Sequence, residues 1–269
     1  PSEVPDLLLR AAHAQEHPIT SLAILAYHKL YAQANAQGIK VLLEGHGGDE
    51  LWAGYTAYQN LGQPNQSQDG SSLIRNRQLL RKAASADVSQ NAFSSWARAT
   101  SELTQAQLRD LWGGKLQRSL RFIDRASMEH HLEVRVPFLD TRVALPALRF
   151  PDSWKIRSGR DRAFLRQMAT PHLGEEVALR AKVPIQDPAR KWLQHELKDY
   201  VMDLLGSKLW IDHYVDVPEL KRLYQQFLRT PDAFDNLTFL LFPIFLEGWY
   251  QAMQSTQWTQ KQEVTFASL

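Results

Sequence analysis

Hydrophobic residues recur at helical spacing along most of this chain. One helix is predicted from Asp6 to Gln15, and a clearer one has Thr20 or Ser21 as its N-cap and ends near Gly38. Further helices are predicted near residues 73–86, 89–99, 104–111, 115–131, 140–149, 161–170, 188–206, 217–229 and 235–253. The pattern therefore predicts a predominantly α-helical chain.

A single segment, Ile39–Glu44, has the pattern of a strand. Its β-branched and leucine residues follow one glycine and stop at the next, which is typical of a buried parallel strand. Helix, strand and glycine loop in this order form half of a βαβ unit. One strand cannot satisfy its own backbone donors and acceptors, so we expect partner strands. They lie either in ambiguous runs such as Ser153–Ile156 or N-terminal to Pro1, and we favour the second alternative.

Two further segments bear on topology and location. The most apolar run, Leu237–Leu246, is too short to cross a bilayer and is interpreted as a buried helix that Pro243 either kinks or divides. The polar stretch from Gln63 to Ser72 is predicted to be an exposed loop. Because no charged and then apolar leader is present, we expect a cytoplasmic protein that has no membrane partner.

Composition narrows the class of ligand. The chain has 269 residues, of which 44% are hydrophobic, enough for a substantial core in one or two domains. Its net charge of +2 gives no global field that would recruit nucleic acid or an anionic membrane. The absence of cysteine excludes thiolate chemistry and disulfides. A small-molecule substrate is therefore expected.

The loop after the predicted strand combines glycines with acids. Gly45, Gly47 and Gly48 would let the backbone approach a phosphate closely, at the carboxyl end of a strand where α/β proteins bind ligands. Asp49 and Glu50 follow with hard oxygen ligands that suit a Mg²⁺-nucleotide. Taken alone, a tight turn with a solvated acidic N-cap explains the loop equally well.

A charged helix and its exit form a second cluster. Arg121, Arg125 and Arg135 could hold a carboxylate or a phosphate, since guanidinium forks match both. A solvated or internally paired helix is the simpler alternative. His130 and His131 resemble a metal pair only superficially, because adjacent helical residues point to different sides.

The third cluster, Lys155–Arg166, is a basic turn that leads into a helix. Cations together with a helix N-terminus would attract a polyphosphate. An exposed basic surface would have the same sequence pattern.

Taken in order, the three clusters resemble the synthetase domain of glutamine-hydrolysing asparagine synthetases. The first is similar to the family's strand and loop signature, Gly-x-Gly-x-Asp-Glu-x-x-x-Gly-Tyr, and the second to its longer signature. The resemblance extends over roughly residues 15–255. The segments that carry it, besides the third cluster, are Leu42–Tyr55, Asp124–Met128, Glu133–Asp140, Lys182–Pro184 and Pro188–Leu193.

The resemblance implies a fold, a reaction and a binding site. The fold would be α/β, of the adenine-nucleotide alpha-hydrolase type, with helices around a parallel sheet. ATP would adenylate the side-chain carboxylate of aspartate, or of a related acceptor, with release of pyrophosphate, and ammonia would then displace AMP. Glu44, Gly45, Gly47 and Gly48 would line the nucleotide, and Asp49 would be a Mg²⁺ ligand.

Two positions depart from the family pattern. His46 stands where the family commonly has Glu or Asp, a group that acts as a base or steers the amine. Imidazole is a suitable base near neutral pH, so His46 is assigned that role. Arg162 replaces a lysine that contacts pyrophosphate, and it keeps the charge but cannot readily transfer a proton.

Two family elements are not found in this chain. It has neither the Ser-Gly-Gly-x-Asp-Ser pyrophosphate loop nor the cysteine that releases ammonia from glutamine. We therefore expect a partial synthetase domain that is inactive alone and is completed by a missing N-terminal portion or by a partner chain. A homodimer remains open.

Two other kinds of protein compete with this ligase interpretation. The departures at His46 and Arg162 also fit a non-catalytic scaffold or a subunit of a split enzyme. A nucleic-acid-modifying adenylating enzyme is disfavoured, because the chain lacks the basic patch and the stacking array that it would need.

Overall fold

The computed structural model describes residues 2–19, 21–61, 101–181, 188–234 and 237–254. The chain forms two compact units. Unit 1 comprises Pro1–Gln33, Ser72–Ala86 and Gln186–Leu269, and unit 2 comprises Ala34–Ser71 and Asp87–Ile185. The helices expected near 73–86 and 89–99, the loop expected at 63–72 and the segment 182–184 lie outside the described residues.

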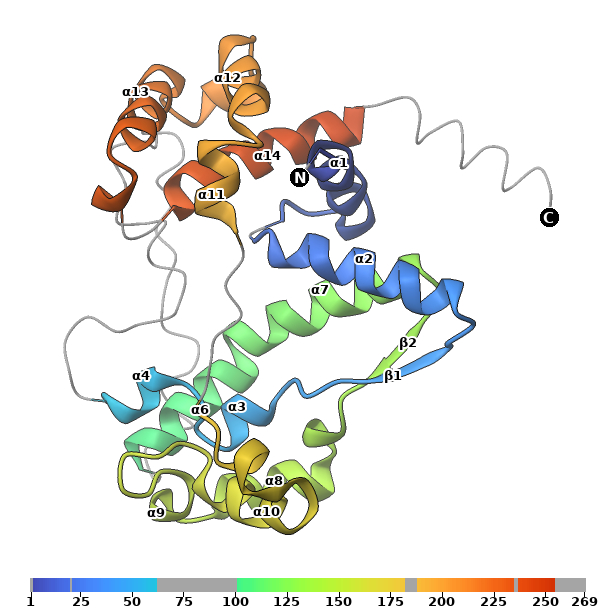
Figure 1. Ribbon diagram of the computed structural model, residues 1–269, viewed down its shortest axis with the longest axis vertical. Coiled ribbons are helices and arrows are strands. Elements are labelled where there is room, and N and C mark those ends of the chain that lie inside the picture. Colours follow the sequence, from blue (N-terminus) through green and yellow to red (C-terminus); the bar gives the residue numbers. More distant parts are fainter. Residues whose placement is uncertain (1, 20, 62–100, 182–187, 235–236, 255–269) are drawn as a thin grey trace. The chain divides into compact units, whose positions relative to one another are not determined.

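Unit 1 is organised around two packed helices, α1 (Val4–Gln15) and α14 (Thr238–Gln254), which lie against each other (Figure 1). They approach closely at Gly248, where a Cβ would lie 3.1 Å from a methyl group of Leu8. Pro243 lies inside α14, which continues through it as a single helix. Of the two predicted effects of Pro243, division of the helix is thus wrong.

The other elements of unit 1 are helical. A helix was expected over 188–206, but the structure divides it at His195. This residue has a φ of −125° and a ψ of −81°, which are not helical values. The carbonyl of Leu193 accepts a hydrogen bond of 2.6 Å from the buried Tyr224 hydroxyl, so a tertiary contact satisfies the end of the first helix. The elements are α2 (Ala23–Ala36), which ends in unit 2, α11 (Ala189–Gln194), α12 (Lys198–Gly206), η5 (Trp210–His213), α13 (Val217–Arg229) and η6 (Pro231–Ala233).

Unit 2 contains a parallel two-stranded sheet of β1 (Val41–Leu43) and β2 (Glu133–Arg135). The register pairs Val41 with Glu133 and Leu43 with Arg135. This sheet with its surrounding helices confirms the predicted α/β class. The partner of β1 lies inside the chain, at a segment that was not predicted to be a strand, because two of its three residues are charged.

Helices make up the rest of unit 2. The run Ser153–Ile156, considered as a strand, is largely helical in α9. Ser101 explains why α6 begins at Glu102, since its hydroxyl accepts the Thr104 N–H at 3.2 Å. The elements are α3 (Gly48–Leu51), α4 (Thr56–Gln59), α6 (Glu102–Trp112), α7 (Lys115–Glu129), η4 (Pro137–Leu139), α8 (Thr141–Arg149), α9 (Asp152–Lys155) and α10 (Ala163–Ala178).

An apolar core in unit 2 holds α3 in place. Leu51 and Trp52 are buried at the end of α3, and Trp52 packs against Phe150 and Phe164 with ring centroids 5.6 and 5.4 Å apart. The loop before α3 is therefore attached to a fixed helix. Within the described ranges, no helix has both the length and the apolar character needed to cross a membrane.

Candidate active site

The first two sequence clusters meet at the carboxyl end of β1. The Glu44 N–H donates to the Arg135 carbonyl at 2.9 Å, which extends the pairing beyond the last residue of β1. In η4, Phe138 packs on Gly48 and Leu139 packs on Gly47. The predicted strand and glycine loop therefore form one packed unit with the exit of α7.

The glycines of the loop serve close packing. Gly47 has a φ of +87°, and a Cβ on it would collide with the side chain of Leu139. A Cβ on Gly48 would lie 3.3 Å from the Phe138 ring, whereas one on Gly45 would meet the same ring only at 4.0 Å. Close packing thus explains why Gly47 and Gly48 have no side chain, whereas Gly45 has the most space beside it.

His46 lies next to Glu44. Its Nδ1 is 2.9 Å from Glu44 Oε2, and only 20% of the imidazole and 15% of the carboxylate are exposed. The carboxylate of Glu44 therefore lies within ion-pair distance of the imidazole. The structure thus places two of the predicted site residues, Glu44 and His46, side by side at the start of the loop.

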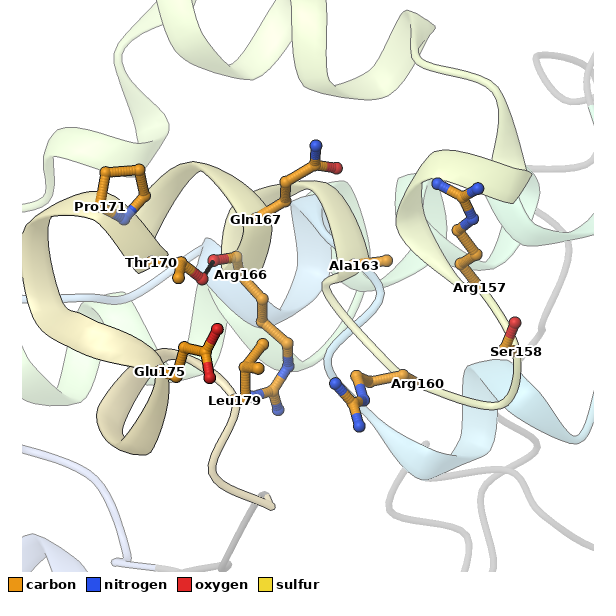
Figure 2. A pocket seen from close by; sticks show the side chains of 10 residues that line it. All are labelled: Arg157, Ser158, Arg160, Ala163, Arg166, Gln167, Thr170, Pro171, Glu175 and Leu179. Atoms are coloured by element: carbon orange, nitrogen blue, oxygen red, sulfur yellow. Dashed lines mark hydrogen bonds between the residues drawn. The ribbon is translucent and has the colours of Figure 1, made fainter.

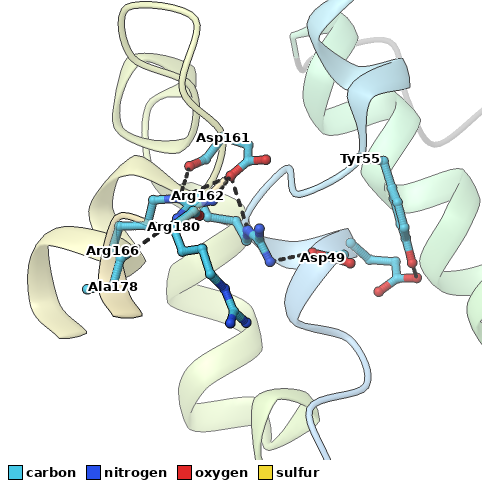
Figure 3. A network of polar contacts seen from close by, with 8 residues as sticks. Asp49, Tyr55, Asp161, Arg162, Arg166, Ala178 and Arg180 are labelled. Atoms are coloured by element: carbon cyan, nitrogen blue, oxygen red, sulfur yellow. Dashed lines mark hydrogen bonds and ion pairs between the residues drawn. The ribbon is translucent and has the colours of Figure 1, made fainter. Parts of the chain in front are cut away.

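The first and third clusters meet through an ion pair. Arg162 Nη1 lies 3.1 Å from Asp49 Oδ1, and Arg162 Nε lies 3.2 Å from Asp161 Oδ1 (Figure 3). Arg166 donates to the same Asp161 oxygen at 2.7 Å from Nη2. Positive and negative groups thus alternate in the order Asp49, Arg162, Asp161 and Arg166. The structure brings together two of the predicted site residues, Asp49 and Arg162.

The backbone of Arg162 is held in an uncommon conformation. Its φ of 51° and ψ of 33° place it in the left-handed region, immediately before α10 begins. For a residue with a side chain this conformation costs on the order of 1–2 kcal/mol. The surrounding contacts of Asp49 and Asp161 offset that cost and direct the guanidinium toward the signature loop.

Arg166 is the fixed end of this ion-pair chain. It is 9% exposed, and its Nη1 donates to the carbonyls of Ala178 and Arg180 at 2.9 and 2.7 Å. Burial raises the pKa of Asp161, but the hydrogen bond from Arg166 and the charges of Arg162 and Arg166 outweigh it and lower the pKa overall. Asp161 is therefore a stable anion that positions Arg162.

The two acids of the loop differ in accessibility. Glu50 is 3% exposed and accepts a hydrogen bond of 2.7 Å from the Tyr55 hydroxyl. Burial, and then the charge of Glu50, raise the pKa of Tyr55, so this hydroxyl remains a donor. The side chain of Asp49 is 27% exposed. Asp49 is consequently the more accessible of the two loop carboxylates.

The absence of a side chain at Gly54 leaves space for the Asp49 carboxylate. A Cβ on Gly54 would collide with the Asp49 carboxylate and lie 3.0 Å from the Asp49 Cα. The Gly54 N–H also donates to the Asp49 carbonyl at 2.8 Å. The sequence showed Gly54 as part of a motif. The structure shows that a glycine is needed there because the backbone at Gly54 lies against Asp49.

Two buried polar side chains support the loop from behind. The amide nitrogen of Gln107 donates to the carbonyls of Glu50 and Leu51 at 2.6 and 2.7 Å. The fully buried Lys155 donates to Gln107 Oε1 at 2.8 Å and to the Leu148 carbonyl at 3.2 Å. Sequence reasoning missed these residues. Lys155 is the first residue of the third cluster, but no periodicity marked it as buried.

The charged residues of the second cluster lie on α7 and β2. Arg135 forms an exposed ion pair with Glu133 at 2.9 Å. Arg121 and Arg125 lie in the middle of α7. His130 is the C-cap of α7. Arg135 thus has an internal ion-pair partner, although it lies on a strand and not on the helix.

The site fits a Mg²⁺-nucleotide in its donor groups. Mg²⁺ keeps several waters and takes one or two protein carboxylates, and Asp49 offers one that is partly exposed. Arg162 provides a permanent cation beside it for phosphate oxygens. Gly45 leaves backbone uncovered at the end of β1. ATP and Mg²⁺ are thus compatible with the residues present.

Comparison with known proteins identifies the family of this chain. The family model described as "Asparagine synthase" matches residues 1–251. "Asparagine synthetase [glutamine-hydrolyzing] 1" of Bacillus subtilis (strain 168) is 35% identical over 82 residues, which cover 30% of this chain and 13% of that protein. A "Putative asparagine synthetase [glutamine-hydrolyzing]" of Mycobacterium bovis and one of Mycobacterium tuberculosis (strain CDC 1551 / Oshkosh) are each 33% identical over 104 residues, covering 38% of this chain and 16% of either relative. The chain matches only a small share of these relatives' length, but the family match is nearly complete. This chain therefore belongs to the asparagine synthase family.

Proposed function

We propose that the chain is part of an ATP-dependent ligase that converts aspartate, or a related carboxylate, to its amide. The carboxylate is adenylated with release of pyrophosphate, and ammonia derived from glutamine then displaces AMP. The observation that supports this most directly is the ion pair between Asp49 and Arg162, residues 113 positions apart in sequence. It joins the proposed metal ligand to the proposed pyrophosphate ligand.

The roles of these two residues follow from their charges. Asp49 holds Mg²⁺, which when bound supplies positive charge to the phosphates of the nucleotide. The guanidinium of Arg162 can pair with a phosphate oxygen in place of Asp49, because its fork of N–H donors matches phosphate geometry. Arg162 therefore stabilises the charge that develops on the leaving pyrophosphate. Asp161 keeps this guanidinium in position.

His46 acts on the attacking amine. The carboxylate of Glu44 lies 2.9 Å from Nδ1, and the imidazole accepts a proton from the amine as the amide bond forms. The backbone of Glu44, Gly45, Gly47 and Gly48 lines the nucleotide. The packing of η4 on the loop keeps this backbone rigid, which limits the reorganisation needed during the reaction.

The test is pyrophosphate release by the natural gene product that carries these residues, with ATP, Mg²⁺ and a series of carboxylates. We expect Asp49→Asn to lower the rate by at least about a hundredfold. Asp232→Asn, on an exposed 3-10 turn of unit 1, is the matched control and leaves the rate unchanged. An equal rate in the Asp49 variant would contradict the assigned role.

A second outcome would favour the non-catalytic scaffold. The folded wild-type protein would then release no pyrophosphate with any carboxylate, and the pair His46→Glu and Arg162→Lys would create activity. An active wild-type protein eliminates that alternative.

A further inference from the structure

The ion pair between Asp49 and Arg162 joins two groups to which the proposed function assigns ligands of opposite charge. The two side chains are only 27% and 24% exposed, respectively. This partial shielding from water strengthens their attraction relative to a pair on the open surface. The group proposed to bind phosphate thus occupies an oxygen of the group proposed to bind a cation (Figure 3).

A second contact holds Arg162 whether or not it pairs with Asp49. The Nε of Arg162 donates to Asp161 Oδ1 at 3.2 Å, whereas Nη1 is the nitrogen that faces Asp49. Among the described residues, Nη2 of Arg162 has no hydrogen-bond or ion-pair partner. The guanidinium can therefore exchange Asp49 for another anion through Nη1 and Nη2 while Nε stays on Asp161.

Arg166 fixes Asp161 from a separate part of the chain. Its Nη2 donates to Asp161 Oδ1 at 2.7 Å, and its Nη1 donates to the carbonyls of Ala178 and Arg180 at 2.9 and 2.7 Å. Figure 2 shows Arg166 extending from the first part of α10 toward Leu179 at the end of the helix. None of these contacts involves the signature loop, so they persist when the ion pair breaks.

The backbone of Asp49 is also held independently of the ion pair. Its carbonyl accepts the Gly54 N–H at 2.8 Å, and Leu51 and Trp52, which follow it, are buried in the core. The carboxylate lies in the space that Gly54 leaves. Release of Arg162 therefore changes the partner of a carboxylate whose position is already set.

Either kind of ligand alone would meet an unfavourable charge at this pair. A divalent cation on Asp49 would face the Arg162 guanidinium, which has the same sign. A phosphate on Arg162 would likewise face the Asp49 carboxylate. When both ligands are present, each side chain exchanges one opposite charge for another, and neither charge remains uncompensated.

We propose that the Asp49–Arg162 ion pair is a latch that couples metal binding to polyphosphate binding. The latch weakens the binding of either ligand when it is alone and opens for the two together, so the two ligands bind with positive cooperativity. The inference rests on the proposed function, because it uses the metal role of Asp49 and the phosphate role of Arg162. It adds that each residue opposes the ligand of the other in the empty site.

Mn²⁺ alone probes the metal half of the latch, because oxygen ligands that suit Mg²⁺ also suit Mn²⁺ and electron paramagnetic resonance measures the free ion. In the natural gene product, Arg162→Gln is expected to tighten Mn²⁺ binding about five- to thirtyfold, since it removes the competing guanidinium. Addition of Asp49→Asn to this variant abolishes the gain, which assigns the bound ion to that carboxylate.

The matched control for the metal half is Arg180→Gln. It removes another exposed arginine of the region in Figure 3 but keeps the backbone carbonyl to which Arg166 donates. Because its side chain does not pair with Asp49, Mn²⁺ affinity should change by less than about twofold. This control separates the direct contact at Asp49 from a general loss of positive charge.

Pyrophosphate alone, titrated calorimetrically in the presence of EDTA, probes the other half of the latch. Asp49→Asn is expected to tighten pyrophosphate binding about five- to thirtyfold, because it removes the anion that competes for Arg162. Arg162→Gln weakens the same binding. Glu176→Gln, which neutralises an exposed acid of α10, is the control and leaves the affinity unchanged. Circular dichroism confirms that every variant is folded.

The outcomes distinguish the latch from the proposed function. The latch is overturned if Arg162→Gln binds Mn²⁺, or Asp49→Asn binds pyrophosphate, no more tightly than the wild type does. It is also overturned if Arg180→Gln tightens Mn²⁺ binding as much as Arg162→Gln. Tighter binding in both variants supports the latch even if the wild type releases no pyrophosphate with any carboxylate, in which case the proposed function alone fails. Wild-type pyrophosphate release with unchanged affinities in the variants overturns the latch alone.

Discussion

The buried contact between Gln107 and Lys155 yields the sharpest prediction for stability. Gln107→Met keeps most of the side-chain volume but removes three hydrogen bonds of 2.6, 2.7 and 2.8 Å. Two of them satisfy carbonyls at the end of α3, and the third is made to a buried ammonium group. With about 1 kcal/mol for each neutral bond and about 2 kcal/mol for the charged one, the free energy of unfolding falls by about 4 kcal/mol.

A double-mutant cycle refines this prediction. In Gln107→Met the Lys155 ammonium keeps the Leu148 carbonyl as its one hydrogen-bond acceptor among the described residues. Lys155→Met removes the ammonium itself, so the double variant is less destabilised than the two single changes added together, by about 1–2 kcal/mol. Urea denaturation followed by circular dichroism measures all four proteins. A loss below about 1 kcal/mol in Gln107→Met, or strict additivity, would show that the contact does not carry the predicted energy.

The same cycle has a pH dependence with a defined sign. Burial lowers the pKa of Lys155. Between that lowered value and the ordinary lysine value the unfolded chain binds more protons than the folded one, so stability rises with pH. Lys155→Met lacks this gain. The stability of the wild type relative to Lys155→Met should therefore increase as the pH is raised toward about 10. A constant difference would contradict the assignment.

Two further substitutions have expected outcomes. Gly54→Ala places a methyl group on the Asp49 carboxylate, so Mg²⁺-dependent pyrophosphate release should fall at least about tenfold while the circular dichroism spectrum stays that of a folded protein; wild-type activity would refute the steric argument. Tyr224→Phe removes the hydrogen bond to the Leu193 carbonyl and leaves that acceptor unsatisfied, which should cost about 1–2 kcal/mol in urea denaturation; an unchanged midpoint would show that α11 does not need this bond.

The helices were predictable because their signals are local. The predicted range 217–229 is the observed α13, where Asp216 caps the first turn and apolar residues repeat at helical spacing. β2 was missed for the opposite reason. Glu133 and Arg135 are exposed and charged, so their sequence does not indicate a strand. The segment is a strand because it pairs with β1. Its identity depends on a contact with a distant part of the chain.

The candidate site was predicted only in part. The resemblance pointed to Asp49 and Arg162. It did not predict their ion pair, because no sequence pattern indicates the left-handed backbone conformation at Arg162. The glycines of the loop were interpreted through phosphate binding, whereas Gly47 is needed because Leu139 occupies the space of its side chain. The role of Gln107 is likewise visible only in the structure, where its amide nitrogen is a donor for two carbonyls at the end of α3.

The parallel pairing of β1 with β2 has a consequence for folding kinetics. It joins residue 41 to residue 133, so the chain must close a long loop before the first strand hydrogen bond can form. α6, α7 and β2 follow one another along the chain, and contacts between neighbours can form early. The backbone from Glu44 to Gly48 takes its final shape only once β1, Phe138 and Leu139 have docked. We therefore expect the loop that carries the proposed chemistry to be among the last parts of unit 2 to become ordered.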